Sequence, residues 1–148
     1  MMSPPVTPDA LIAQVLGTVK TIAMVGASAN PSRPSHSVMR YLQGKGYRVI
    51  PVNPGFAGQT LLGETVREKL SDIAEPVDMV DIFRRSDAVP PIVDDAIKTG
   101  VPNVWMQLGV RHDAAAAKAE AAGLTVIMDR CPKIELERLA EILPGRSR

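Results

Sequence analysis

The sequence predicts an α/β fold, a doubly wound sheet of about five parallel strands with helices on both faces. Five short apolar runs alternate with segments of helical periodicity. These runs lack the polar alternation of a half-exposed strand, which is typical of parallel strands that helices cover on both faces. The expected strands span 21–27, 47–54, 77–85, 103–109 and 123–129.

Apolar residues at helical spacing predict the helices that separate these strands. The first helix is expected to begin at Pro8, with Thr7 as its N-cap, and to end at Gly17. Glycines at helix C-caps set the later boundaries. The remaining helices are expected from an N-cap at Ser35 to Gly44, from Val89 to Gly100, over 113–122 and over 132–143, and a loop or minor strand at 59–66 precedes a short helix that ends near Ile73.

Length and composition bound the class of protein. The 148 residues, 45% hydrophobic and 22% charged, fit one globular domain over 1–148 with a loose tail at 1–6. A net charge of +1 argues against nucleic acid as a partner, because such surfaces carry a basic excess. With one cysteine, no signal peptide and no apolar run of membrane-spanning length, we expect a cytoplasmic protein that does not contact a membrane.

The stretch between the first strand and the next helix is the first candidate binding site. Ligands of such sheets bind outside the carboxyl ends of the strands. At this junction, free backbone N–H groups and the helix dipole favour a phosphate. Gly26 permits close backbone approach, the serines from Ser28 to Ser37 supply hydroxyl groups, and Arg33 or Arg40 would supply positive charge.

The loop does not match the familiar nucleotide-binding patterns. An NAD site expects G-x-G-x-x-G here and an acidic residue about 20 positions further on. In this chain the loop after Gly26 is longer and contains two prolines, Pro31 and Pro34. The second strand closes with Asn53 and Pro54 in place of a carboxylate. The Walker pattern is also absent. The loop therefore favours a phosphate compound held in neither the usual NAD nor the usual ATP manner.

Five segments that cover most of the chain form a recognisable ordered set: VGAS…NPSRPS, GYRVIPVNP, VDIFRR…VP, VWMQLGVR and AGLTVIMDRCPKIE. In this order they resemble the small stand-alone CoA-binding proteins, whose Rossmann-like domain is similar to the N-terminal half of the succinyl-CoA synthetase alpha subunit. The resemblance implies coenzyme A as the cofactor. It implies contacts from four loops: Gly26, Ala27, Ser28, Arg33 and Ser35; Val52, Asn53 and Pro54; Phe83, Arg84 and Arg85; and Gln107, Leu108 and Gly109.

Two departures from the synthetase pattern shape the expected function. The synthetase has a lysine two residues after the proline of its second loop, where this chain has Phe56, so the arginines are expected to supply the charge. The domain that carries the synthetase's phosphorylated histidine is missing. We therefore expect a non-catalytic module that binds CoA or an acyl-CoA and acts as a carrier, a sensor or the partner of an enzyme. A homodimer is one possible assembly. The alternative is an NAD(P)-linked oxidoreductase or an acyl-CoA enzyme that uses the same crevice.

Three further side chains carry potential chemistry. His36 and His112 are possible general bases, but neither is paired with a nucleophile in the sequence, and the histidines and cysteine have no zinc-ligand spacing. We expect no catalytic residue and no metal. Cys131 lies beside Arg130 at the expected start of the last helix. Such places favour thiolates, so a mixed disulfide with CoA is conceivable, against the default of a buried thiol.

Overall fold

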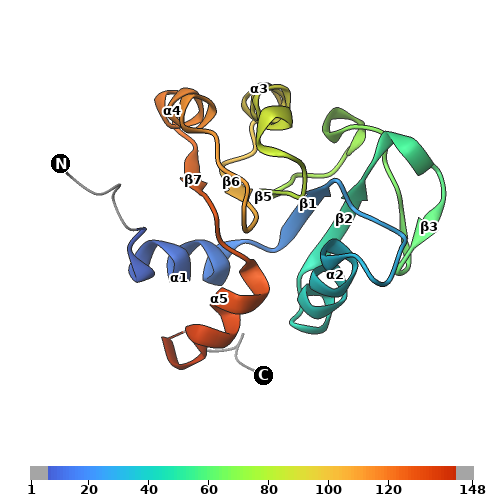
Figure 1. Ribbon diagram of the computed structural model, residues 1–148, viewed down its shortest axis with the longest axis horizontal. Helices are drawn as coiled ribbons and strands as arrows, with labels where there is room; N and C mark the ends of the chain where they lie inside the picture. Colours follow the sequence, from blue (N-terminus) through green and yellow to red (C-terminus); the bar gives the residue numbers. More distant parts are fainter. Residues whose placement is uncertain (1–6, 143–148) are drawn as a thin grey trace.

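The computed structural model describes residues 7–142 and contains a five-stranded, fully parallel sheet (Figure 1). The order across the sheet is β2-β1-β5-β6-β7. All five expected strands are confirmed, each shorter than its apolar run. Their bounds are β1 Thr21–Val25, β2 Arg48–Val52, β5 Met79–Ile82, β6 Asn103–Met106 and β7 Thr125–Ile127.

Strand order reverses between β1 and β5. From β1 the chain crosses to β2 on one side, then returns to pair β5 with the other side of β1. Loops that leave β1 and β5 therefore diverge and open a crevice at the carboxyl edge of the sheet. This is the Rossmann-like arrangement that the sequence predicts, and it places the candidate site at the β1–β5 boundary.

Helices cover both faces of the sheet (Figure 1). One face carries α1, α2 and α5, and the other carries α3 and α4. A short antiparallel hairpin, β3 with β4, confirms the minor strand expected at 59–66, and η2 is the expected short helix. The bounds are α1 Asp9–Thr18, α2 Pro34–Gly44, α3 Val89–Thr99, α4 Asp113–Ala121, α5 Pro132–Arg138, β3 Thr60–Leu61, β4 Glu64–Thr65, and the 3-10 turns η1 Pro54–Phe56, η2 Leu70–Asp72, η3 Ser86–Ala88 and η4 Ala140–Ile142.

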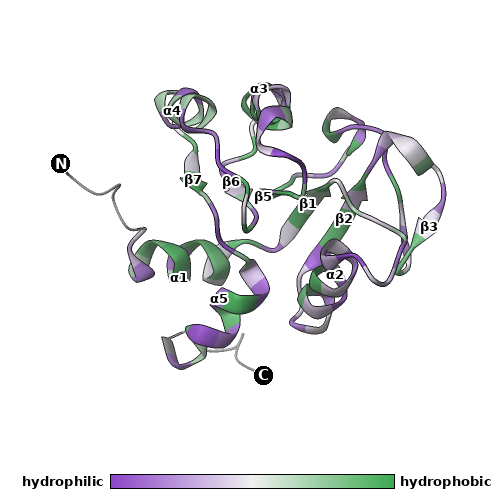
Figure 2. Ribbon diagram, in the orientation of Figure 1, coloured by the Kyte–Doolittle hydropathy of each residue, from purple (hydrophilic) through white to green (hydrophobic). Residues whose placement is uncertain are grey.

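Alternate residues of each strand build two separate cores. In β1, Ile22 and Met24 pack towards α1, α2 and α5, whereas Ala23 and Val25 pack towards α3 and α4. Both sets are buried because successive side chains of a strand point to opposite faces. Figure 2 shows the result, with hydrophobic colour along the central strands and on the helix faces turned to them. No helix among residues 7–142 is long and apolar enough to cross a membrane.

Two expected boundaries of α1 are wrong. The helix begins at Asp9 with Pro8 as its N-cap, so Thr7 lies outside it. It also continues through Gly17 to Thr18. Gly17 has no positive φ, so the chain does not turn there, and Val19 returns to an extended conformation instead.

The expected N-cap of α2 is also wrong. Pro34 occupies the first helical position and Arg33 is the extended N-cap residue. A proline suits this position because its missing N–H has no helical partner to lose. Ser35 is buried one residue further on, where its hydroxyl serves the preceding loop.

The last helix is shorter than its periodicity predicts. It ends at Arg138, and Leu139 leaves the helical conformation before the turn η4. The expected end at Leu143 and the expected tail at 1–6 lie outside the described residues. What matters for the site is the start of this helix, because Cys131 and Pro132 take the N-cap and first helical positions as expected.

Candidate functional site

Gly26 joins β1 to the first loop at the reversal of strand order. Its N–H continues the ladder to the Val52 carbonyl oxygen at 2.9 Å, and its φ of +90° lies in the region that favours glycine. A Cβ placed on it would lie 2.3 Å from the Phe83 carbonyl oxygen. The loop after β1 and the loop after β5 are therefore in direct backbone contact.

The first loop is held by its own polar side chains. The Ser35 hydroxyl accepts the Ser28 N–H at 3.1 Å, and the Ser28 hydroxyl accepts the Asn30 N–H at 3.1 Å. The Asn30 side chain in turn accepts the N–H and the hydroxyl of Ser32. Within residues 7–142, the N–H groups of Ala27 and Ser35 have no hydrogen-bond partner. They are the donors that the loop leaves for an anion.

Asn53, directly after β2, ties the second loop to the first. Its Nδ2 donates to the Ala27 carbonyl oxygen at 2.8 Å, and its Oδ1 accepts the Gly55 N–H at 2.8 Å. Its backbone N–H donates to the Arg67 carbonyl oxygen. The side chain is thus committed to protein contacts at the place where a dinucleotide site would present a free carboxylate.

Two adjoining cavities open at this edge of the sheet. The smaller, which we call the loop cavity, has a volume of about 300 Å³, and the larger, which we call the arm cavity, about 850 Å³. Pro34 and Phe83 line both, so the cavities meet at the start of α2. The loop cavity is also lined by Gly26, Ala27, Ser28, Arg33, Ser35 and Asn53, and the arm cavity by Val38, Arg84, Arg85, Gln107, Leu108, Val110, Cys131, Lys133 and Ile134.

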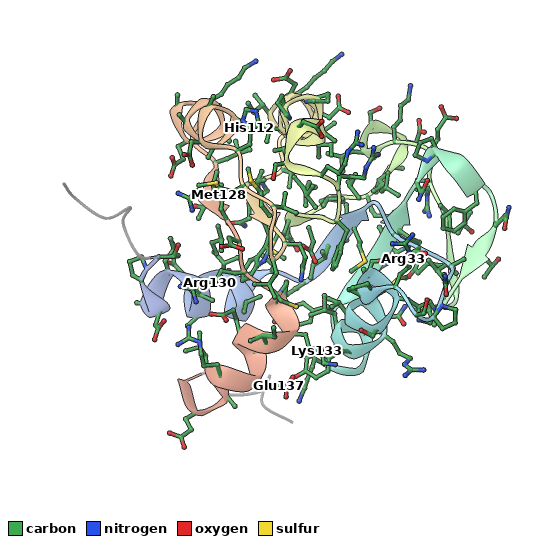
Figure 3. The ribbon with its side chains drawn as sticks, viewed as in Figure 1. Arg33, His112, Met128, Arg130, Lys133 and Glu137 are labelled. Carbon is green, nitrogen blue, oxygen red and sulfur yellow. The ribbon has the colours of Figure 1, made fainter. Side chains whose placement is uncertain are left out.

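The charged residues around the two cavities are all cationic. Arg33, Arg84, Arg85 and Lys133 line them, and the described linings include no Asp or Glu. Arg33 lies at the start of α2 and Lys133 near the start of α5 (Figure 3). Arg85 forms an ion pair with Asp87 at 3.3 Å, but both side chains are highly exposed, so the pair holds Arg85 only weakly. The site therefore concentrates positive charge in a chain of net charge +1.

Most of the expected site residues line one of the two cavities, and three do not. Val52 is buried in the core towards α3, Pro54 begins the exposed turn η1, and Gly109 forms a turn whose N–H donates to Asp129 Oδ1 at 2.7 Å. Phe56, which stands at the synthetase's lysine position, packs against the core and lines neither cavity. Arg40 is exposed on α2, away from both.

The contribution of α5 to the arm cavity was missing from the expected site. Cys131, the N-cap residue, and Lys133 and Ile134 of the helix line the cavity together with Val38 of α2. The two helices pack against each other across about a hundred residues of sequence, which no local pattern reveals. A signal did exist in Cys131 and its flanking cations, which the sequence singles out for reactivity and not for cavity lining.

Two buried side chains near the carboxyl edge of the sheet carry oxygens that lack hydrogen-bond partners. Both carboxylate oxygens of Asp81 and the Oε1 of Gln107 are buried without a hydrogen bond among the described residues. Burial raises the pKa of the Asp81 carboxyl well above its ordinary value, and no other cause contributes. Orphaned groups of this kind are costly, so they are expected to have a role.

The histidines have ordinary structural positions. His112 is the N-cap of α4, where its Nδ1 accepts the Ala115 N–H at 3.0 Å (Figure 3). His36 lies in the first turn of α2 and lines neither cavity. The part of the chain that the structure describes has no group of three or more His, Cys, Asp or Glu residues able to hold a metal.

A parallel sheet with this order of strands and a loop cavity at its reversal are typical of the Rossmann-like class of α/β protein. The family model described as CoA binding domain matches residues 20–137. This chain therefore belongs to the CoA binding domain family.

Known relatives cover most of the chain. The uncharacterized protein YneT of Bacillus subtilis (strain 168) is 38% identical over 83% of this chain and 90% of its own length. A Thermus thermophilus structure, cell-free ID.343, is 41% identical with a TM-score of 0.86, covering 90% of this chain and 99% of that one. A dinucleotide forming acetyl-coenzyme A synthetase of Ca. Korarchaeum cryptofilum is 27% identical with a TM-score of 0.69, covering 78% of this chain but 27% of that one.

Proposed function

We propose that the chain binds coenzyme A or an acyl-CoA along the two cavities, as a non-catalytic carrier or sensor that acts alone or with a partner enzyme. The observation that carries this proposal is the continuity of an anion-binding cavity with a larger, mainly apolar one. CoA has the same division, because its phosphates are followed by a long pantetheine arm. A pocket of about 300–1,000 Å³ is the usual size for such ligands.

The loop cavity supplies what a phosphate needs. The unpaired N–H groups belong to Ala27, just after β1, and to Ser35, in the first turn of α2, and both residues line this cavity. The dipole of α2 also favours an anion there. Arg33 lines the same cavity. Charge-assisted hydrogen bonds from such donors contribute about 1.5–3 kcal/mol each.

The arm cavity suits an uncharged chain. Val38, Phe83 and Val110 line it, together with the exposed side chains of Leu108 and Ile134. These last two are the large apolar residues that the described surface leaves most exposed, and both border this cavity. A ligand that covers them would gain about 25 cal/mol for each Å² of apolar surface removed from water.

An NAD(P)-linked enzyme is the weaker candidate. The Asn53 side chain already donates to Ala27 and accepts from Gly55, so it is not free for a ribose. No acidic side chain lines either cavity within residues 7–142. Both points favour CoA over a dinucleotide.

Calorimetric titration with CoA, acetyl-CoA, NAD, NADP and ATP tests the proposal. We expect only the CoA compounds to bind. Arg84→Ala should weaken their affinity at least fivefold and make that affinity less dependent on salt. Arg40→Ala is the matched control, because Arg40 is exposed and lines neither cavity. Absence of CoA binding by the folded protein, or binding of NAD in its place, would overturn the proposal.

A further inference from the structure

Asp81 is a fully buried acid in the central strand β5, one residue before the strand ends. It lies in β5 between Met24 of β1 and Trp105 of β6, its partners in the register of the sheet. All three residues have no exposed surface. Met24 and Trp105 belong to the core beneath α1, α2 and α5, and the register places Asp81 on that same face.

Gln107 is a polar candidate partner on the same face. It follows β6 directly, two residues after Trp105, and its N–H continues the ladder to the Ile82 carbonyl oxygen at 3.2 Å. Standard strand spacing puts the Cα atoms of Asp81 and Gln107 about 8 Å apart, which their two side chains together span. Gln107 lines the arm cavity, is 7% exposed, and has a fully shielded Oε1.

We propose that Asp81 is a neutral carboxylic acid that donates its proton to Gln107 Oε1, and so holds the Gln107 amide with its Nε2–H group towards the arm cavity. One hydrogen bond then satisfies two of the three orphaned atoms. Oε1 and Nε2 diverge from the same carbon. When Oε1 points towards Asp81, Nε2 therefore points towards the arm cavity. Asp81 acts here as a positioning residue and Gln107 as the group that contacts ligand.

The surroundings of Asp81 agree with a neutral acid. Its neighbours in the sheet are apolar, and burial alone raises the pKa of its carboxyl. The groups able to carry charge that face the arm cavity are Arg84 and Arg85 from the loop after β5, and Cys131 and Lys133 from α5, whereas α2 contributes Pro34 and Val38. Glu135 of α5, a helix that covers this face, is also buried but is paired with Arg130 and Arg138.

The pair defines the chemistry of the group that the arm cavity recognises. An amide N–H in a mainly apolar cavity binds a carbonyl oxygen, such as an amide of the pantetheine arm or the thioester of an acyl-CoA. Identifying this carbonyl as part of CoA rests on the proposed function. The neutral acid–amide pair itself does not.

The first experiment needs no ligand. We measure the unfolding equilibrium constant of the wild type and of Asp81→Asn by urea titration from pH 4 to pH 9. Below the raised pKa the native wild type keeps a proton that the unfolded chain loses above about 3.8, the ordinary value. Relative to Asp81→Asn, the wild-type constant should therefore rise up to tenfold per pH unit until the native pKa is reached. Parallel pH dependences would overturn the neutral acid.

A spectroscopic measurement on the wild type guards against a variant that fails to fold. The ¹³C resonance of the Asp81 carboxyl should stay at its protonated position at neutral pH, and should move in Gln107→Leu, which removes the acceptor. An ionised carboxyl at neutral pH, or an Asp81 resonance that does not move in Gln107→Leu, would overturn the pair.

The second experiment tests the effect on ligand. CoA affinity should fall about tenfold in Gln107→Leu and in Asp81→Leu, with the double variant no weaker than either, whereas Asp81→Asn should bind within threefold of the wild type because its amide also donates. Additive losses, or full affinity in Asp81→Leu, would overturn the positioning role. Wild type that binds no CoA, but shows the pH slope and a carboxyl resonance that responds to Gln107→Leu, would reject the proposed function and retain the pair.

Discussion

The backbone of Gly26 packs directly against the carbonyl group of Phe83, so closely that a single added carbon would lie 2.3 Å from the Phe83 oxygen. This contact joins the loop after β1 to the loop after β5 across the reversal of strand order. Phe83 also lines both cavities. One glycine therefore sets the relative position of the two loops on which the site depends.

Replacing this glycine should damage both stability and binding. Gly26→Ala combines a left-handed backbone at φ +90° with an overlap against Phe83, for a cost of about 2–5 kcal/mol in unfolding free energy. Gly123→Ala is the control: φ is +91°, but nothing lies within 4 Å of its Cβ, so only about 1–2 kcal/mol is expected. Urea unfolding measures both. Equal losses would show that the Phe83 contact carries no weight.

Asn53 should matter for ligand binding as well as for stability. Asn53→Ala removes the hydrogen bonds to Ala27 and Gly55, which should cost about 1–2 kcal/mol and weaken CoA binding as the first loop loosens. Asn103→Ala is matched, because Asn103 Nδ2 donates to the Asp78 carbonyl oxygen at the opposite edge of the sheet. It should lose similar stability and keep its CoA affinity. Calorimetry of the two variants decides whether the Asn53 contact serves the site.

Cys131 offers a direct probe of the arm cavity. It is the chain's single cysteine, it is 5% exposed, and it lines the cavity. We expect CoA, but not NAD, to slow its alkylation at least tenfold by filling the route to the thiol. If the alkylation rate instead rises only as urea unfolds the whole chain, the cavity gives the reagent no access to the Cys131 thiol. Intact mass after incubation with CoA disulfide checks the mixed disulfide, which stays a prediction.

The ion network that joins α1 to α5 should contribute more than a surface pair. Glu135 is 3% exposed, and its Oε1 accepts from Arg138 at 2.7 Å and from Arg130 at 3.3 Å. Arg138→Ala removes the shorter contact and the link to Asp9, and should lower the unfolding free energy more than the loss of an exposed pair does, because Glu135 stays buried.

The control for this network is a pair that lies fully at the surface. Lys118→Ala breaks only the exposed contact with Asp94 and should cost under about 1 kcal/mol. Urea unfolding of both variants gives the comparison, and equal losses would show that the burial of Glu135 adds nothing. The Arg138 hydrogen bond also lowers the pKa of the Asp9 carboxyl. The stability that Asp9 contributes is therefore present above its ordinary pKa and is lost as the pH falls through the lowered value.

The sequence by itself determined the strands, their order along the chain and the edge of the sheet where the candidate site lies. Apolar runs such as Thr21–Val25 can be recognised because burial on both faces of a parallel sheet excludes polar residues from the whole strand. The loops that follow these strands were therefore predictable, and most of the expected residues line the two cavities. The wrong boundaries lie at helix ends. Ser35, for example, was expected to cap α2, but its hydroxyl accepts the Ser28 N–H of the preceding loop.

Only the tertiary structure decided which side chains share a cavity and which lack partners. The packing of α5 beside α2 brings Cys131 to the same cavity as Val38, and the register of β5 with β6 places Asp81 beside Trp105, two residues before Gln107. Asp81 reads in the sequence as one polar residue in an apolar run. Its burial arises from neighbours on β1 and β6 that are distant along the chain. Such long-range contacts have no local pattern, because they depend on which surfaces the folded helices and strands bring together.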